Sequence, residues 1–173
     1  EVFMKLAASA DVIIESFRPG VVARLGVDYD AVRAIKPDIV YASISAYGQT
    51  GPLAADPAHD LAVEAMCGLL SNNVDVNDNP VIPGMPAGDM LAATLALSGI
   101  LMALLRRADT GQGDYLDVAM MDSILACMPN SMGAAFADKV PPEPKNERIW
   151  GGNALYRIYE TADAKHITLG GSE

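Results

Sequence analysis

The chain has 173 residues, of which 51% are apolar, 20% are charged and 6% are aromatic. A chain of this length can bury a sizeable core, and this composition excludes a disordered protein. The net charge of −10, with 12 scattered basic residues, argues against a nucleic-acid partner, because phosphate contacts need clustered Lys and Arg.

The first third of the chain alternates helical and strand patterns. Short runs of β-branched apolar residues bounded by polar ones predict buried strands of a parallel sheet. In chain order we expect a helix over 1–9, a strand over 12–16, helices over 21–25 and 30–35, and a strand over 39–45 that ends in the glycine-rich turn 46–54. This alternation is typical of an α/β domain with crossover connections.

Two further helices follow the glycine-rich turn. Asp56 and Pro57 predict the start of the first, over 57–71, as its N-cap and first helical residue. Asp89 would cap the second, whose apolar run 90–105 is too short to span a bilayer comfortably, so we expect a buried helix and no membrane partner. Beyond them we expect a strand over 114–120, a helix over 121–137, and a hairpin of 154–161 and 166–170.

Both ends of the chain fall inside a pattern. The sequence opens without Met in a helical stretch and closes on a strand followed by the beginning of something else, so we expect a piece of a longer polypeptide. Cys67 and Cys127 lie in apolar segments without CxxC or disulfide spacing. This favours a reducing, cytoplasmic location, and no metal site is expected.

His59 is one of two histidines and falls near the third position of the expected helix 57–71. The positive end of the helix dipole disfavours a second positive charge there, so a neutral imidazole could act as a base. A packed or capping histidine is the other interpretation, and spacing alone favours it.

Asp89 follows Gly88 at the start of the expected long helix. The simplest interpretation is an ordinary N-cap carboxylate. The functional interpretation is a carboxylate held beside a glycine that lets a ligand approach closely. Glu173 follows two glycines and a strand, and by itself it indicates no role.

Two loops follow the ends of predicted strands. Arg18 follows the first strand, and a turn with Gly48, Gly51 and Pro52 follows the second. Open α/β sheets bind ligands beyond the carboxyl ends of their strands, so these loops are a candidate binding edge. No GxGxxG or P-loop pattern is present, and an ordinary loop remains the alternative.

Four ordered motifs resemble those of the class III CoA-transferases, the family of formyl-CoA transferase, CaiB and α-methylacyl-CoA racemase. They are DVIIESFRPGVVARLGVDYDAV at 11–32, YASISAYGQTGP at 41–52, DTGQGDYLDVAMMDS at 109–123 and LYRIYETAD at 155–163. The resemblance covers essentially the whole chain. It implies a Rossmann-like large domain over 1–138 without its first βα unit, a linker over 139–153, the beginning of a smaller α+β domain over 154–173, and an interlocked homodimer.

The resemblance also implies a substrate and a site. The substrate would be an acyl-CoA, with coenzyme A bound only as part of it and no permanently bound cofactor. Asp89 matches the catalytic aspartate shared by both branches of the family. The residues that would hold the substrate are Arg18, Ala46, Tyr47, Gly48, Gln49, Gly51 and Gly88.

His59 bears on the choice between the two branches. The racemase branch has an HD(I/L) motif, an aspartate some thirty positions on and a glutamate after a glycine-rich strand end, and His59, Asp89 and Glu173 match these. We therefore expect an α-methylacyl-CoA racemase. His59 and Asp89 would exchange a proton with the carbon beside the thioester, and Glu173 would orient His59.

A CoA transferase is the alternative, in which Asp89 attacks the thioester and carries the acyl group as an anhydride, without need for His59. Three departures from the racemase pattern keep it open: AHDLAV stands in place of GHDINY, Met85 in place of an asparagine, and MLAA at 90–93 in place of a glycine-rich run. An inactive CoA-ester binding module and a purely structural helical domain are the remaining hypotheses.

Overall fold

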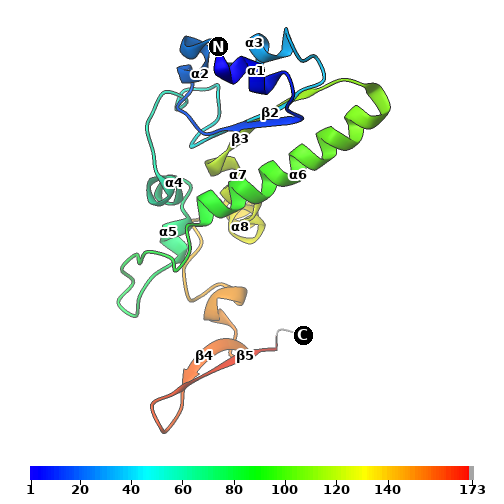
Figure 1. The fold of residues 1–173 in the computed structure, drawn as a ribbon. Coiled ribbons are helices and arrows are strands. Elements are labelled where there is room, and N and C mark those ends of the chain that lie inside the picture. Colours follow the sequence, from blue (N-terminus) through cyan, green and yellow to red (C-terminus); the bar gives the residue numbers. More distant parts are fainter. Residues whose placement is uncertain (172–173) are drawn as a thin grey trace. The chain divides into compact units, whose positions relative to one another are not determined.

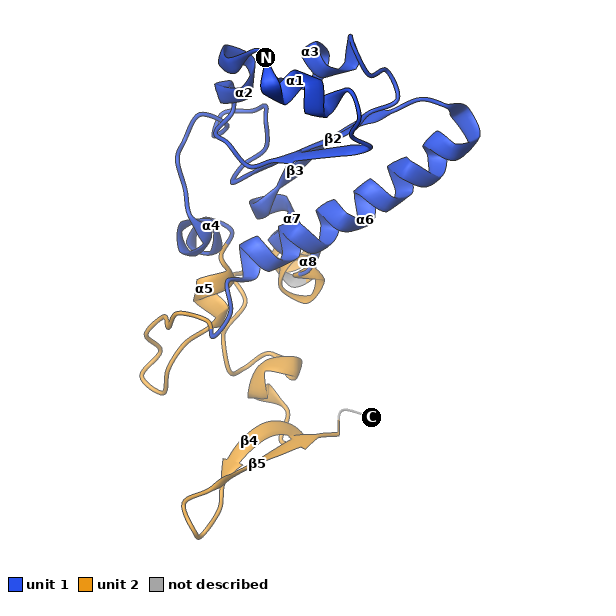
Figure 2. Cartoon of the chain, in the orientation of Figure 1, with its two compact units in different colours: residues 1–67, 84–127 blue, residues 68–83, 128–173 orange. Residues whose placement is uncertain are grey.

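The computed structural model describes residues 1–171, apart from the side chain of Ala134. The chain forms two compact units (Figure 2). Unit 1 consists of residues 1–67 and 84–127, and unit 2 of residues 68–83 and those from 128 onward. The predicted domain boundary at residue 138 remains a prediction about the longer protein.

Unit 1 is built on a parallel sheet with the strand order β1-β2-β3. The strands are β1 (Val12–Glu15), β2 (Val40–Ser45) and β3 (Asp114–Ala119). In the central strand the residues from Val40 to Ser43 are at most 1% exposed, because both faces of the sheet are covered. The three strands predicted for this part of the chain are confirmed, and the fold is mixed helix and sheet.

Helices cover both faces of this sheet (Figure 1). On one face, α1 (Val2–Ala7) and α3 (Tyr29–Arg33) bury Ala7 and Val32 against strands β1 and β2. The short α2 (Val21–Leu25) precedes α3 in the crossover between those strands. On the other face, α6 (Ala87–Thr110) packs Ile100 and Ala103 against Val40 and Ala42.

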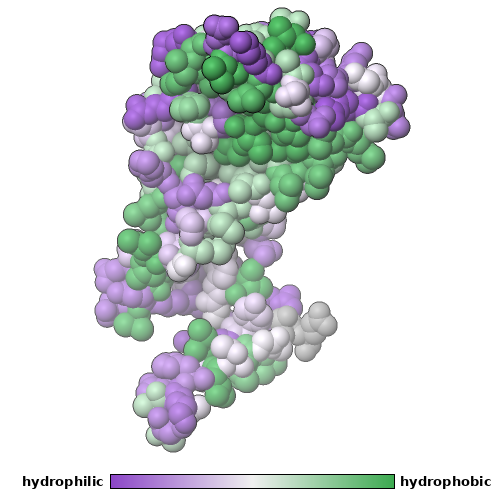
Figure 3. Space-filling view, viewed as in Figure 1, coloured by the Kyte–Doolittle hydropathy of each residue, from purple (hydrophilic) through white to green (hydrophobic). Residues whose placement is uncertain are grey.

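The helix α6 is buried along one face only. Ala92, Ala96, Ile100 and Ala103 recur every three or four residues and are buried, as in an amphipathic helix on a sheet. Other apolar side chains are more than half exposed, namely Leu97, Leu101, Met102 and Leu105. The prediction of a buried helix is therefore wrong for this second face, whose apolar surface is visible along α6 in Figure 3.

α6 is also long and apolar enough to cross a membrane, by length and composition alone. Its packing against β2 is that of a core helix of an α/β unit. The absence of a membrane partner stays a prediction.

Two helices that the sequence predicts as continuous are each broken. α4 (Asp60–Met66) and α5 (Leu69–Asn72) are separated at Gly68, whose φ of 84° is left-handed and ends the first helix. α7 (Met120–Ala126) and α8 (Pro129–Asp138) are separated before Pro129, because proline disfavours a helical conformation at the preceding residue.

The predicted helix starts are also wrong by a few residues. α4 begins after His59, which is its N-cap, and not at Pro57. α6 begins after Pro86, so that Asp89 is the third helical residue and not the N-cap. Neither N-cap residue makes a capping side-chain hydrogen bond. At the start of α6, side chains of α4 accept the N–H groups of Ala87 and Asp89 instead.

Unit 2 combines α5, α8 and an antiparallel hairpin of β4 (Tyr156–Glu160) and β5 (His166–Gly170). The hairpin confirms the prediction, with Ile158 opposite Thr168. Asp163 closes its turn by accepting from Thr161 Oγ1 and pairing with Lys165 at 2.7 Å. One irregular helical turn, η1 (Arg148–Gly152), precedes the hairpin.

Candidate active site

The starts of α4 and α6 adjoin in unit 1, and they carry the two residues predicted to be catalytic. His59 and Asp89 are both exposed. Asp60, which follows His59, accepts a hydrogen bond at Oδ1 from the main-chain N–H of Asp89, with 3.0 Å between the two atoms. This contact brings together two segments that the sequence separates by some thirty positions.

The position of His59 differs from the prediction in a way that matters for its role. As the N-cap it has an extended backbone, and its side chain makes no capping hydrogen bond. The interpretation of His59 as a side chain that caps its helix is therefore wrong. An exposed imidazole beside the Asp60–Asp89 contact remains accessible to a ligand.

A buried carboxyl group, Glu64, lies behind these residues. Its Oε1 accepts the main-chain N–H of Ala87, the first residue of α6, at 2.9 Å. Burial raises the pKa of Glu64, against the lowering effect of this hydrogen bond, and the nearby charge of Asp60 raises it further. Sequence reasoning missed both Glu64 and Asp60. Their i, i+4 spacing was the available signal, because it puts two acidic groups on one helix face where they would repel.

Gly88 makes room for neighbours within the chain. A Cβ atom there would lie 3.0 Å from Asp60 Oδ1 and 3.3 Å from carbons of both Met120 and Ile124. The absence of a side chain thus lets α6 approach α4 and α7. Its predicted contact with the substrate stays a prediction.

The turn after β2 is held at the carboxyl edge of the sheet. Gly48 and Gly51 have left-handed φ values of 84° and 98°, which glycine adopts without strain. Both carboxylate oxygens of Asp117, in β3, accept the main-chain N–H of Gln49, at 3.1 and 3.0 Å. The N–H of Met121 donates to the carbonyl of Ala46 at 3.1 Å. The neighbouring strand therefore fixes the turn that we predict to bind CoA.

Unsatisfied polar atoms gather near the same edge. Glu15 Oε1, Ser45 Oγ and Gln49 Nε2 are buried and have no hydrogen-bond partner among the described residues. Glu15 ends β1 and Ser45 ends β2, and the exposed Arg18 follows in the loop after β1. Buried polar groups in native proteins find a partner in protein, water or ligand, so this edge can accept a polar ligand.

Comparison with known proteins gives the same family as the sequence motifs. The family model of CoA-transferase family III matches residues 1–173. The chain belongs to this family. It is 39% identical to an acetyl-CoA:oxalate CoA-transferase of Acetobacter aceti, over 99% of this chain and 44% of that protein. It is 33% identical to a human succinyl-CoA:glutarate CoA-transferase, over 98% of this chain and 38% of that protein.

A solved structure supports the family III fold. The CAIB/BAIF family protein from Brucella suis superposes with a TM-score of 0.84 and 28% identity, over 94% of this chain and 43% of that one. The family III chain thus spans less than half the length of these relatives.

Replacing Asp117 by Ala is expected to weaken CoA binding about tenfold in the full-length family III protein, because the Gln49 N–H loses its acceptor and the turn loosens. Isothermal titration with CoA measures the change. The matched control is Asp109→Ala, an exposed aspartate of α6 far from the turn in sequence. Equal affinities for the two variants would contradict an anchoring role for Asp117.

Glu173, the third predicted catalytic residue, lies outside the described residues. Between residues 1 and 171 no cluster of three or more His, Cys, Asp or Glu side chains could hold a metal ion.

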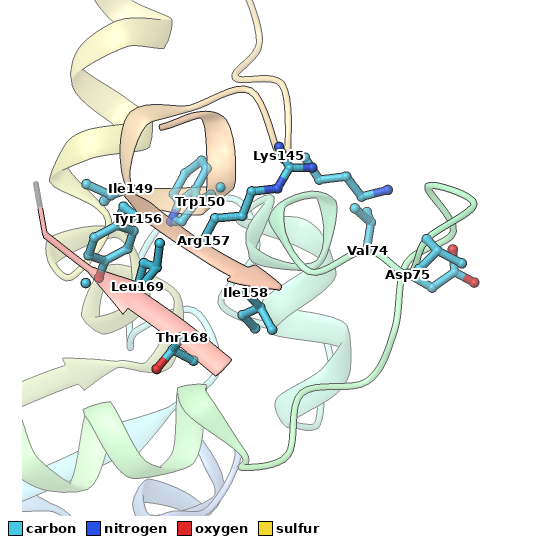
Figure 4. A pocket seen from close by; sticks show the side chains of 13 residues that line it. Val74, Asp75, Lys145, Ile149, Trp150, Tyr156, Arg157, Ile158, Thr168 and Leu169 are labelled. Atoms are coloured by element: carbon cyan, nitrogen blue, oxygen red, sulfur yellow. The ribbon is translucent and has the colours of Figure 1, made fainter. Parts of the chain in front are cut away.

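Unit 2 contains a pocket of about 910 Å³, and none of the predicted site residues that the structure describes lines it (Figure 4). The hairpin, the segment 145–151 and the loop 74–76 form its walls. Trp150 and Tyr156 contribute aromatic rings, while Lys145 is paired with Asp78 at 2.5 Å. Because the described site residues lie elsewhere, this pocket gives no support to the chemistry predicted for the chain.

Proposed function

We propose that the full-length protein is a CoA-transferase that moves CoA from an acyl-CoA to a free carboxylic acid, with Asp89 as the nucleophile. The observation that carries this proposal is the exposed Asp89 carboxylate on a helix start that Asp60 holds through the main chain. The relatives quoted above are named as CoA-transferases, which favours this alternative over the racemase that the sequence pattern favoured.

The reaction needs one carboxylate nucleophile, and the CoA thiolate must stay bound to the protein between the two halves of the reaction. An Asp89 oxygen attacks the thioester carbonyl carbon, the C–S bond breaks, and CoA leaves as a thiolate while Asp89 holds the donor acyl group as an anhydride. The thiolate then attacks the Asp89 carbonyl carbon, which releases the donor acid and leaves an aspartyl thioester. A second acid then attacks the aspartyl thioester and releases the CoA thiolate, which forms a second anhydride. The thiolate attacks the carbonyl carbon of this acid, so the acid departs as its CoA ester and the Asp89 carboxylate is restored.

The edge of the sheet would hold CoA in this proposal. The turn 46–52 supplies main-chain groups, and Arg18 supplies a cation suited to a phosphate. The unpaired buried atoms of Glu15, Ser45 and Gln49 favour a polar ligand nearby. A cytoplasmic location and an interlocked homodimer remain part of the proposal for the longer protein.

Oxygen transfer tests the role of Asp89 directly. The full-length protein is incubated with an acyl-CoA and an acceptor acid that carries ¹⁸O in both carboxyl oxygens. When the acceptor acid becomes a CoA ester it leaves one oxygen on the nucleophile, so the peptide containing Asp89 should gain one ¹⁸O by mass spectrometry. CoA transfer without label in that peptide would rule out Asp89 as the nucleophile.

Racemisation is the second candidate, because the exposed His59 adjoins the Asp60–Asp89 contact. Replacing His59 by Ala is expected to change the rate of CoA transfer by less than about threefold, since attack by Asp89 requires no base. The same variant would lose any exchange of the α-proton of a 2-methylacyl-CoA in D₂O. Exchange by the wild type without CoA transfer would reject the transferase and favour the racemase.

A further inference from the structure

Glu64 is a buried carboxyl group that the proposed mechanism does not use. It is 0% exposed and lies on α4 one helical turn after Asp60. While Oε1 accepts the N–H of Ala87, Oε2 is buried and has no hydrogen-bond partner among the described residues. A buried, charged oxygen without a donor is costly, so this group requires either a donor or a proton of its own.

The neighbour of Glu64 is a second carboxyl group. The side chain of Asp60 lies within hydrogen-bonding reach of Glu64, while its Oδ1 accepts the N–H of Asp89. Two carboxyl groups form a hydrogen bond with each other only when one of them carries a proton. Each of the two groups accepts one main-chain N–H, but Asp60 is only half-buried whereas Glu64 is wholly buried, so the proton belongs on Glu64.

We propose that Glu64 is a positioning residue for Asp89. It keeps its proton and donates a hydrogen bond through it to Asp60, and so fixes Asp60 Oδ1 against the N–H of Asp89. Its other oxygen fixes the N–H of Ala87. Side chains of α4 thereby supply partners for two of the first N–H groups of α6, which no residue of α6 or its N-cap satisfies.

This arrangement leaves the Asp89 side chain free for the reaction while its main chain is held. The charged groups that act on Glu64 most strongly are Asp60 from its own helix and Asp89 from α6, and the thiol of Cys67 donates to the Glu64 main-chain carbonyl at 3.4 Å. α7, which packs against both helices, presents the apolar Met120 and Ile124 toward Gly88. No cation among these neighbours would stabilise an ionised Glu64, which agrees with the raised pKa of this group.

The inference rests on the proposed role of Asp89 and is tested with Glu64→Gln and Glu64→Leu in the full-length protein. The amide of Gln can donate to Asp60 and accept from Ala87, as a protonated Glu does. We expect kcat for Glu64→Gln within about twofold of the wild type, and kcat for Glu64→Leu about 10- to 100-fold lower with KM for the acyl-CoA changed less than about threefold. A wild-type kcat in Glu64→Leu, or a Gln variant as slow as the Leu variant, would overturn the proposal.

Hydrogen exchange separates this proposal from the proposed function. The main-chain amides of Ala87 and Asp89 should remain protected in Glu64→Gln and lose protection in Glu64→Leu, whether or not the protein transfers CoA. A wild type that transfers no CoA would reject the transferase, while unchanged protection in Glu64→Leu would reject the positioning role.

If Glu64→Leu does not fold, the pH dependence of the free energy of unfolding, compared between the wild type and Glu64→Gln, tests the proposal instead. A carboxyl group whose pKa is raised from 4.5 in the folded state binds more protons folded than unfolded above that value. The wild type should therefore lose stability relative to Glu64→Gln as the pH rises from 4.5 through the raised pKa. A difference that stays constant over this range would show that Glu64 is ionised and overturn the proposal.

Discussion

Replacing Asp89 by Asn in the full-length protein is expected to lower the rate of CoA transfer by at least about 1000-fold. The carboxamide has nearly the same shape, but it lacks the carboxylate that attacks the thioester. The hydrogen bond from the Asp89 N–H to Asp60 involves the main chain and so survives the substitution. Initial rates of CoA-ester formation, followed by chromatography, measure the loss.

The matched control is Asp56→Asn, an exposed carboxylate in the loop before α4. It should leave the rate within about twofold of the wild type. CoA affinity should also be unchanged in Asp89→Asn, because we assign CoA binding to the turn 46–52 and Arg18. A variant that keeps a tenth or more of the wild-type rate would exclude attack by Asp89.

The sheet of unit 1 could be predicted from the sequence because its strands are short apolar runs with polar ends. Val40 to Ser43 are buried on both faces, so periodicity is absent and composition alone marks the strand. The breaks within the two helices could not be predicted, because Gly68 and Pro129 lie within apolar patterns that continue past them. The exposed face of α6 was missed for a related reason, since a helix apolar all round is typical of a buried one.

Part of the candidate site also depends on contacts that sequence spacing does not reveal. The approach of α4 to α6 rests on Glu64 and Asp60, two acidic side chains that a sequence pattern assigns to the surface. The sequence placed His59 and Asp89 at the starts of two helices, and the family motifs added their catalytic roles, but the exact helical positions were wrong by a few residues. Asp89 is the third residue of α6, whose first N–H groups are held by Glu64 and Asp60, and His59 is the N-cap of α4.

The largest expected loss of stability comes from Gly113→Ala, at the entry to β3. A Cβ atom at this position would overlap the main-chain carbonyl of Ile39, where β3 begins to pair with β2. Neither backbone can move freely, because Asp114 N–H donates to the Ile39 carbonyl at 3.1 Å and Ile39 is fully buried. We expect the free energy of unfolding to fall by about 3 kcal/mol, measured by urea denaturation of the full-length protein.

Gly99→Ala in α6 separates this steric effect from the general effect of adding a methyl group. A Cβ atom at Gly99 would meet Leu116 side-chain carbons at 3.5 and 3.6 Å, which is ordinary contact. Because alanine favours a helix interior over glycine, this variant should be unchanged or up to about 1 kcal/mol more stable. If Gly113→Ala unfolded within about 0.5 kcal/mol of the wild type, the close approach of β3 to Ile39 would be wrong, and with it the register that places Asp117 beside the CoA turn.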